Sequence, residues 1–539
     1  MKYLLVLSFA LSLSSCVNTP QTKGSYTQWW QLNAVELVTQ LEQGNVTSVE
    51  LVQHYNQRIE RFDWDGPRIQ SVLTLNPNAL KEAQRLDELR SQGQVLSPLH
   101  GIPILVKDNI DTKNLPTTAG SLALINNDTQ RDAPIIQRLK SAGLIILGKT
   151  NLSEWANFRS EDSISGWSGV GGQTRNPHDL SRSPCGSSSG SGAAVAAGFA
   201  PVAIGTETNG SIICPASMNG IVGYKPTVGL LPRTHIVPIS PSQDTAGPMT
   251  KSVHDAALLA AIMAGPDSQD ELSKGTETLV EELQQALSPS LKGVRIGVMR
   301  TEQGRNAVII DVFNSALTAL SAAGAELVDI TEYNPPEDFW DASYQVLLSE
   351  FEPSLNAYLS STPNQEQPRS LADLIEFNAS SERELMLFDQ SIFEKASKAP
   401  SLESQDYRNA VNLVQQATRA EGIDQLLADY NVSLLVAPSN NPAFMIDGIY
   451  GDHGPWGWLG FGWAAAIAGY PHVSIPMGVY KHLPLGISII SGQWEDVAVL
   501  NAAAALQQQI RVELMPAAIS SDGWQKEQSV WLPIETKPR

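Results

Sequence analysis

Short apolar runs alternate with longer amphipathic stretches along most of this chain. The short runs predict buried strands, and they cover residues 71–75, 102–106, 144–147, 294–299, 327–330, 433–437 and 485–490. The stretches with apolar residues three and four positions apart predict helices, most clearly over residues 34–43, 77–90 and 311–323. This alternation predicts an α/β protein with a single large mixed central β-sheet covered by helices on both faces.

Two further features refine the predicted helices. Thr47 and Glu50 form a capping-box pattern, which predicts a helix that begins there and continues to about residue 61. Residues 332–429 are polar and mostly helical in pattern, so we interpret them as an insertion or cover on the sheet.

The first residues have the pattern of a targeting segment. Lys2 precedes an apolar run over residues 4–13 that is too short to span a bilayer. The run ends in Leu-Ser-Ser-Cys at residues 13–16, which resembles a bacterial lipobox. This predicts a signal peptide over residues 1–15, lipidation of Cys16, a tether over residues 16–27, and an exported lipoprotein anchored to a membrane of the bacterial cell envelope. An ordinary signal peptide with a chance cysteine is the alternative.

Composition and charge limit the remaining choices. The chain has 539 residues, 42% hydrophobic and 17% charged, as expected of a globular protein with a large core. No linker-like change of composition divides it, which predicts one domain over residues 28–520 and a tail over residues 521–539. A net charge of -20 argues against nucleic-acid partners, because phosphate binding needs basic patches. The sequence does not indicate an oligomeric state.

Two loops rich in serine and glycine are candidates for a catalytic site. They cover residues 185–192 and 205–211. Loops of this composition turn backbone N–H groups toward a ligand, and hydroxyls beside such groups are typical of nucleophilic catalysis with an oxyanion site. A flexible serine-glycine linker is the alternative. Apolar segments flank both loops, which favours the catalytic interpretation.

Several motifs occur in a fixed order around these loops. They cover residues 101–109, 148–151, the two loops and residues 223–227. In this order they resemble the amidase signature family, serine hydrolases that cleave amide bonds without a metal or cofactor. The resemblance implies that Ser211 is the nucleophile, that Ser187 follows a cis peptide bond and carries protons, and that Lys107 is the base.

The resemblance also implies an acyl-enzyme intermediate and a supporting set of groups. The backbone N–H groups of Thr208, Asn209, Gly210 and Ser211 would form the oxyanion hole. Ser188 would support the proton relay by hydrogen bonding. The expected partner is a small-molecule or peptide amide.

Lys107 has two interpretations from the residues alone. It follows an apolar strand, and burial would lower its pKa enough for it to act as a base. Alternatively it pairs with an acid such as Asp108. The family resemblance favours the base.

The chain departs from the general family pattern at Cys185, Glu207 and Asn209. These departures resemble the peptide amidase branch, which removes the amide from peptide C-termini. An aryl or fatty-acyl amide hydrolase and a catalytically silent binding lipoprotein remain alternatives. The sequence also leaves open whether Cys185 and Cys214 form a disulfide or two buried thiols.

Three further patterns have competing interpretations. Residues 143–150 match the Walker A spacing, but their apolar centre predicts a strand instead of a phosphate loop. Residues 186–190 match a nucleophile elbow with Ser188 as nucleophile and His472 or His453 as base, but no second feature of that fold is present. Residues 448–463, rich in glycine and tryptophan, either line the substrate cleft or form a surface loop.

Overall fold

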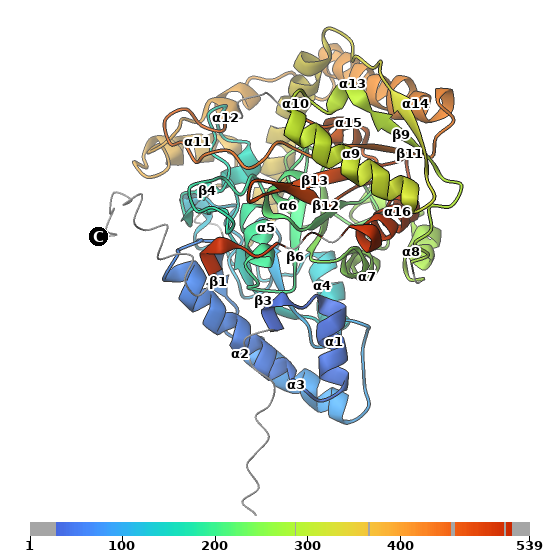
Figure 1. Cartoon of the computed structure of the whole chain (residues 1–539). Helices are drawn as coiled ribbons and strands as arrows, with labels where there is room; N and C mark the ends of the chain where they lie inside the picture. The colour runs from blue at the N-terminus through green and yellow to red at the C-terminus, as the bar shows by residue number, and fades with distance from the viewer. Residues whose placement is uncertain are drawn as a thin grey trace, which may run out of the picture.

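The computed structural model describes residues 29–285, 287–364, 367–453, 459–510, 512 and 514–519. Its largest element is an 11-stranded mixed sheet (Figure 1), which confirms the predicted fold class. In spatial order the strands are β1 (Val72–Leu75), β3 (Ile145–Thr150), β2 (Pro103–Lys107), β6 (Val202–Glu207), β8 (Thr245–Thr250), β7 (Val222–Lys225), β12 (His472–Tyr480), β13 (Leu483–Ile490), β11 (Leu434–Pro438), β9 (Arg295–Met299) and β10 (Glu326–Ile330).

The strands expected from the apolar runs are all present, but four strands in the middle of the sheet were missed. These are β6, β7, β8 and β12. Strands buried on both faces lose the alternation of apolar and polar residues, and these strands also contain Gly or Pro, as in the run from Thr245 to Thr250. Neither a period of two nor a continuous apolar run therefore marks them.

Strands β2 and β6 are parallel neighbours, with Val106 opposite Ile204. The carboxyl ends of parallel neighbours meet at one edge of a sheet. Lys107, the last residue of β2, therefore lies beside Thr206 near the end of β6. This register brings together two segments that are far apart in the sequence.

The N-terminal helices follow the sequence signals closely. Helices α1 (Ala34–Glu42), α2 (Ser48–Arg58) and α3 (Ala79–Ser91) lie together at one end of the molecule. Both halves of the predicted capping box at Thr47 and Glu50 are formed. The second helix ends earlier than expected, because a π-helical stretch over Ile59–Trp64 continues the chain.

Helices cover both faces of the sheet. Helices α5 (Ser189–Ala196) and α6 (Ile213–Asn219) pack together on one face, and α7 (Val253–Met263), α9 (Ala307–Ala322) and α16 (Asp496–Gln509) pack on the other. Helix α5 is built of Ser, Gly, Ala and Val, and these small side chains let it lie buried among four strands. The other short elements are α4 (Pro134–Ser141), α8 (Glu277–Leu283), α15 (Gly462–Ala468), β4 (Trp167–Ser168) and β5 (Gly172–Gln173).

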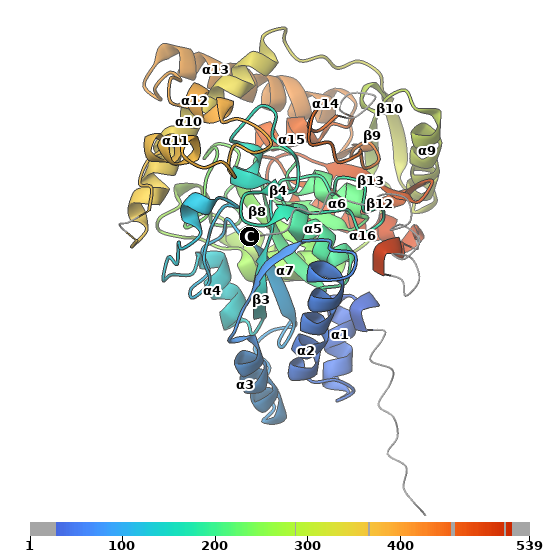
Figure 2. The same cartoon turned by 90° about the vertical axis from the view of Figure 1, so that its left-hand side faces the viewer.

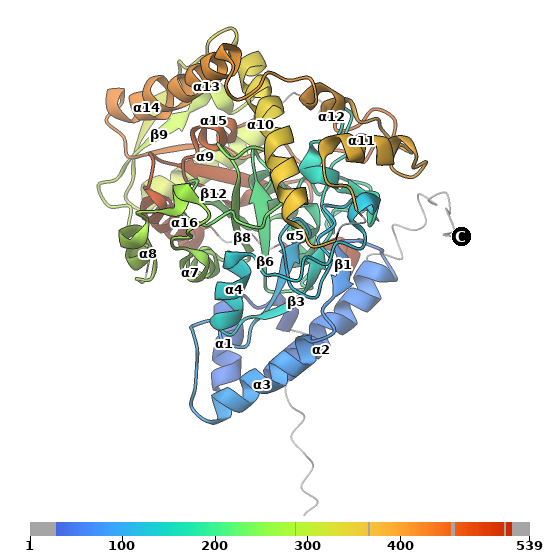
Figure 3. The same ribbon diagram turned by 180° about the vertical axis from the view of Figure 1, so that it is seen from behind.

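Residues 339–429 form the helices expected of a cover. They are α10 (Phe339–Ser361), α11 (Leu371–Ala379), α12 (Ser391–Ala396), α13 (Gln405–Thr418) and α14 (Asp424–Asp429). These helices gather at the end of the molecule opposite α1 to α3 (Figures 2 and 3). Arg159, which is fully buried, joins this cover to the segment that follows β3 through Glu384 at 3.1 Å and Glu154 at 2.8 Å.

Candidate active site

Lys107 lies at the end of β2 with none of its surface exposed. Its Nζ lies 2.7 Å from Ser187 Oγ, 2.8 Å from Thr206 Oγ1 and 3.2 Å from the carbonyl oxygen of Thr206. Burial lowers the pKa of Lys107 to about 7, although the charges of Glu207 and Asp244 oppose this shift. The amine is therefore able to lose its proton near neutral pH and accept one from a hydroxyl.

Asp108 is not the partner of Lys107. Its carboxylate forms a buried ion pair with Lys149 at 2.9 Å. Lys149 belongs to β3, so the run with Walker A spacing is a strand, as the sequence indicated. Its lysine is buried and paired with Asp108. The structure thus excludes a pair between Lys107 and Asp108 and removes the phosphate-loop alternative.

The first serine loop brings Ser187 to Lys107. The peptide bond between Gly186 and Ser187 is cis, the conformation that the family resemblance implied. The backbone N–H of Ser153 donates to the carbonyl oxygen of Ser187 at 3.1 Å. Ser187 is fully buried, so it can hand a proton on without exchange with bulk water.

Ser188 forms hydrogen bonds with Thr206, the residue that also contacts Lys107. Its Oγ donates to the carbonyl oxygen of Thr206 and accepts from the N–H of Thr206, both at 3.1 Å. It therefore fixes the end of β6. His472, one of the two bases considered for the elbow alternative, is buried, and its imidazole bonds to Ser488 at 2.6 Å.

The second loop runs from Thr208 to Ser211 between β6 and α6. Ser211 is 9% exposed, and its carbonyl oxygen accepts from the N–H of Ser188 at 3.1 Å. Within the described part of the chain, no hydrogen bond is donated by the N–H groups of residues 208–211. Four successive N–H groups beside a hydroxyl can stabilise a developing oxyanion.

This loop turns through one residue in the left-handed region. The structure has φ of +81° at Gly210, with open space where a Cβ would project. The glycine therefore provides the turn.

Three residues that sequence reasoning missed as site residues support these loops. Glu207 accepts from the N–H groups of Ile212 and Ile213 at 2.7 and 3.0 Å, and so ties the loop to the start of α6. Asp244 accepts from the hydroxyl of Thr208 at 2.5 Å. Asn109 donates to Thr206 Oγ1 at 3.0 Å, and its place two residues after Lys107 was the only signal for it.

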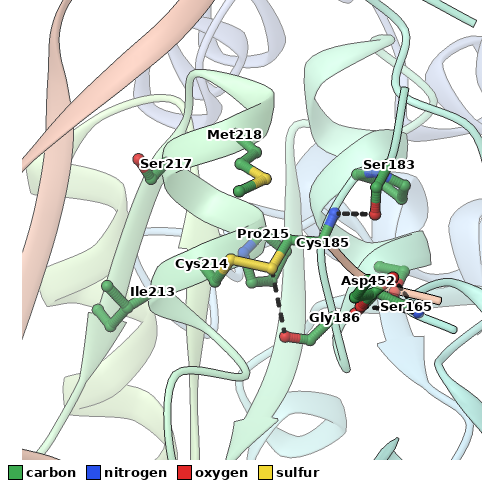
Figure 4. Close-up of a disulfide and its surroundings, with 12 residues drawn as sticks. Ser165, Ser183, Cys185, Gly186, Ile213, Cys214, Pro215, Ser217, Met218 and Asp452 are labelled. Carbon is green, nitrogen blue, oxygen red and sulfur yellow. Dashed lines mark hydrogen bonds between the residues drawn. A yellow bond between two sulfur atoms is a disulfide. The ribbon is translucent and has the colours of Figure 1, made fainter. Parts of the chain in front are cut away.

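A disulfide joins the two loop regions (Figure 4). Cys185 and Cys214 are bonded, which decides a question that the sequence left open. Cys185 precedes the cis peptide bond and has φ of +59°, a conformation that favours glycine. Cys214 lies in α6, so the bond ties the loop of Ser187 to the helix that follows Ser211.

The stretch at residues 448–463 is only partly described. Ile449 and Tyr450 are 85% and 70% exposed, as in a surface loop. Phe461 and Trp463 pack on Tyr333. Residues 454–458 lie outside the described residues, so the prediction of a cleft-lining role stays a prediction for them.

Known proteins resemble this chain over most of its length. The family model described as Amidase matches residues 50–500. Proteins with amidase names from Schizosaccharomyces pombe and Arabidopsis thaliana are 34% and 33% identical, over 89% and 96% of this chain and 85% and 97% of their own. The native peptide amidase of Stenotrophomonas maltophilia is 42% identical with a TM-score of 0.85, covering 91% of this chain and 99% of that structure.

These comparisons correct the predicted localisation. An exported lipoprotein of a bacterial cell envelope was expected. The curated relatives that match nearly the whole chain include yeast and plant proteins, and their names mention neither export nor a lipid anchor. The segments on which that prediction rested, residues 1–15 and 16–27 with Cys16, lie outside the described residues, as does the predicted tail over residues 521–539.

The described residues lack two other kinds of feature. None of their helices has the length and apolar character needed to cross a membrane. They also contain no group of three His, Cys, Asp or Glu side chains that could hold a metal ion.

Proposed function

Because this chain belongs to the amidase family, we propose that it hydrolyses the C-terminal amides of peptides, with Ser211 as nucleophile, Ser187 as proton carrier and Lys107 as base. The amide-hydrolase activity follows from the family. The triad and the peptide substrate are our inference, supported by the 42% identity to a peptide amidase.

The observation that carries the proposal is the contact between Lys107 Nζ and Ser187 Oγ at 2.7 Å in a fully buried site. A desolvated, neutral lysine can take the proton of Ser187, and Ser187 then takes the proton of Ser211 as Ser211 Oγ attacks the amide carbon. The negative charge moves to the carbonyl oxygen, where the free N–H groups of residues 208–211 stabilise it.

The second half of the reaction reverses the proton path. Ser187 gives a proton to the amide nitrogen, the carbon–nitrogen bond breaks, and ammonia leaves. Lys107 replaces the proton on Ser187. Water then attacks the acyl-enzyme, and its proton returns along the same route as the carboxylate product and free Ser211 form.

A release assay tests the proposal. Ammonia or amine is measured from peptide C-terminal amides, aryl amides and fatty-acyl amides, with Ser211→Ala as the inactive control. Higher kcat/KM for peptide amides is expected. Higher kcat/KM for aryl or fatty-acyl amides would favour those alternatives, and no turnover of any amide by the wild type would favour a silent binding protein.

A further inference from the structure

A cavity of about 350 Å³ lies beside the segment that leads to Ser211. Its lining includes Asn109, Thr206, Glu207 and Thr208 on one side and residues of α10 on the other. Cavities of this size bind small molecules or side chains. Because Thr206 also contacts Lys107, the cavity adjoins the residues proposed for catalysis.

Asp244 places a carboxylate in the cavity wall, and that carboxylate keeps a free acceptor position. Three hydrogen bonds reach its carboxylate, from the hydroxyl of Thr208 and the N–H groups of Ile239 and Ser240. A carboxylate has about four acceptor positions, so one remains free. No Lys, Arg or His of the described residues forms an ion pair with Asp244.

The charge of Arg233 acts on Asp244, but the guanidinium forms its hydrogen bonds with other groups. Arg233 also lines the cavity, but Asp270 holds it through two hydrogen bonds of 2.9 and 2.6 Å, and its remaining contact is with the carbonyl oxygen of Pro241. Burial raises the pKa of Asp244 to about 6, so its carboxylate is charged above neutral pH.

Asn109 supplies an independent second acceptor. It is only 3% exposed, and its Nδ2 is bonded to Thr206. Its Oδ1 has no hydrogen-bond partner among the described residues. A buried polar atom without a partner is costly, so a ligand that donates a hydrogen bond there gains binding free energy.

The rest of the lining is mixed, with an apolar part made of Ala156, Ile236, Val237, Ile239 and Ala357. Such a surface suits a chain of methylene groups that ends in a hydrogen-bond donor.

We propose that this cavity binds a positively charged group on an apolar stem, such as a lysine or arginine side chain, with Asp244 and Asn109 as its acceptors. The inference rests on the proposed function and deepens it. Ammonia is the whole leaving group of a primary amide, so a cavity of this size beside the nucleophile loop receives the acyl part of the substrate.

The test compares two peptide amides that differ only in charge, one ending in lysinamide and one in norleucinamide. The assay runs at about pH 8, where Lys107 is mostly neutral and Asp244 charged. The ratio of their kcat/KM values cancels effects on the shared catalytic steps. We expect the wild type to favour lysinamide by about ten-fold or more, the effect of one charge-assisted hydrogen bond.

Three variants locate the effect. Asp244→Asn should bring the ratio to within about two-fold of one, because the charge is gone. Thr208→Val should slow both substrates and keep the ratio, because it disturbs the nucleophile loop and leaves the carboxylate. Glu403→Gln removes an exposed acid from the cover and should change neither.

The outcomes separate this inference from the proposed function. A wild-type ratio near one, with both substrates hydrolysed, overturns the cationic site and leaves the amidase mechanism standing. Hydrolysis of neither substrate overturns the proposed function instead. If Asp244→Asn does not fold, inhibition of the wild type by n-butylammonium is compared with inhibition by 1-butanol, and equal inhibition overturns the inference.

Discussion

Lys107 Nζ and Ser187 Oγ lie 2.7 Å apart, and neither residue is exposed to solvent. The two residues come from different elements, the end of β2 and the loop before α5. Their contact places a nitrogen of lowered pKa next to a hydroxyl that has no other base beside it among the described side chains. The predictions about catalysis follow from this pair.

The activity should depend on pH through Lys107. Only the unprotonated amine can accept a proton, so kcat/KM should rise as the pH increases through about 7 and level off above it. Lys107→Met should lose the activity. His472→Asn is the matched control, because burial already lowers the pKa of His472 to about 3, and its profile should keep the same rising limb. A limb that moves in His472→Asn contradicts the lysine base.

Substitution of Ser211 should affect catalysis, whereas substitution of Ser188 should affect stability. Ser211→Ala should lower kcat on the order of 10⁴-fold or more, with little change in stability, because the hydroxyl is the attacking group. Ser188→Ala removes the acceptor of the Thr206 N–H and one of the donors to the Thr206 carbonyl oxygen, so it should cost about 1–3 kcal/mol of unfolding free energy. Urea unfolding and labelling with a fluorophosphonate measure the two effects. Labelling that survives Ser211→Ala but not Ser188→Ala would show the roles to be reversed.

The sequence predicted the outer strands and the serine loops, and missed the strands between them. Runs such as residues 102–106 are apolar enough to be recognised. Strand β8, with Gly and Pro in its centre, is recognisable only from its neighbours β6 and β7. Its position is a tertiary property, because hydrogen bonds to both sides stabilise a segment of weak intrinsic preference.

The site shows the same division. Lys107, Ser187 and Ser211 could be proposed from motif order, because each is a residue type with distinctive chemistry. The support from Asp244 could not, because it depends on a carboxylate meeting the hydroxyl of Thr208 from 36 positions away in the sequence. The sequence could not predict which lysine Asp108 pairs with, because its partner Lys149 lies on the neighbouring strand β3.

The pair of Asp108 and Lys149 should matter for stability rather than for proton transfer. Both side chains are at most 2% exposed, so removing one leaves the other charged and buried. Asp108→Ala should lower the unfolding free energy by about 3–5 kcal/mol. The double variant Asp108→Leu with Lys149→Met should recover much of this loss, because it removes both charges. Urea unfolding of the three proteins gives the comparison, and an additive double variant would contradict the pairing.

The disulfide between Cys185 and Cys214 should stabilise the fold by limiting the unfolded chain. The two cysteines are 29 residues apart, and closing a loop of that length is worth about 3–4 kcal/mol. The paired variant Cys185→Ser with Cys214→Ser should therefore unfold at lower urea concentration than the wild type. Adding a dithiol should shift the wild type toward the variant and leave the variant unchanged. Thiol counting in a Cys16→Ser background removes the remaining cysteine from the signal, since the chain has three. The prediction is contradicted if reduction exposes two thiols in the wild type but leaves its unfolding midpoint unchanged. In that case the packing of α5 against α6 alone would hold the two loops together.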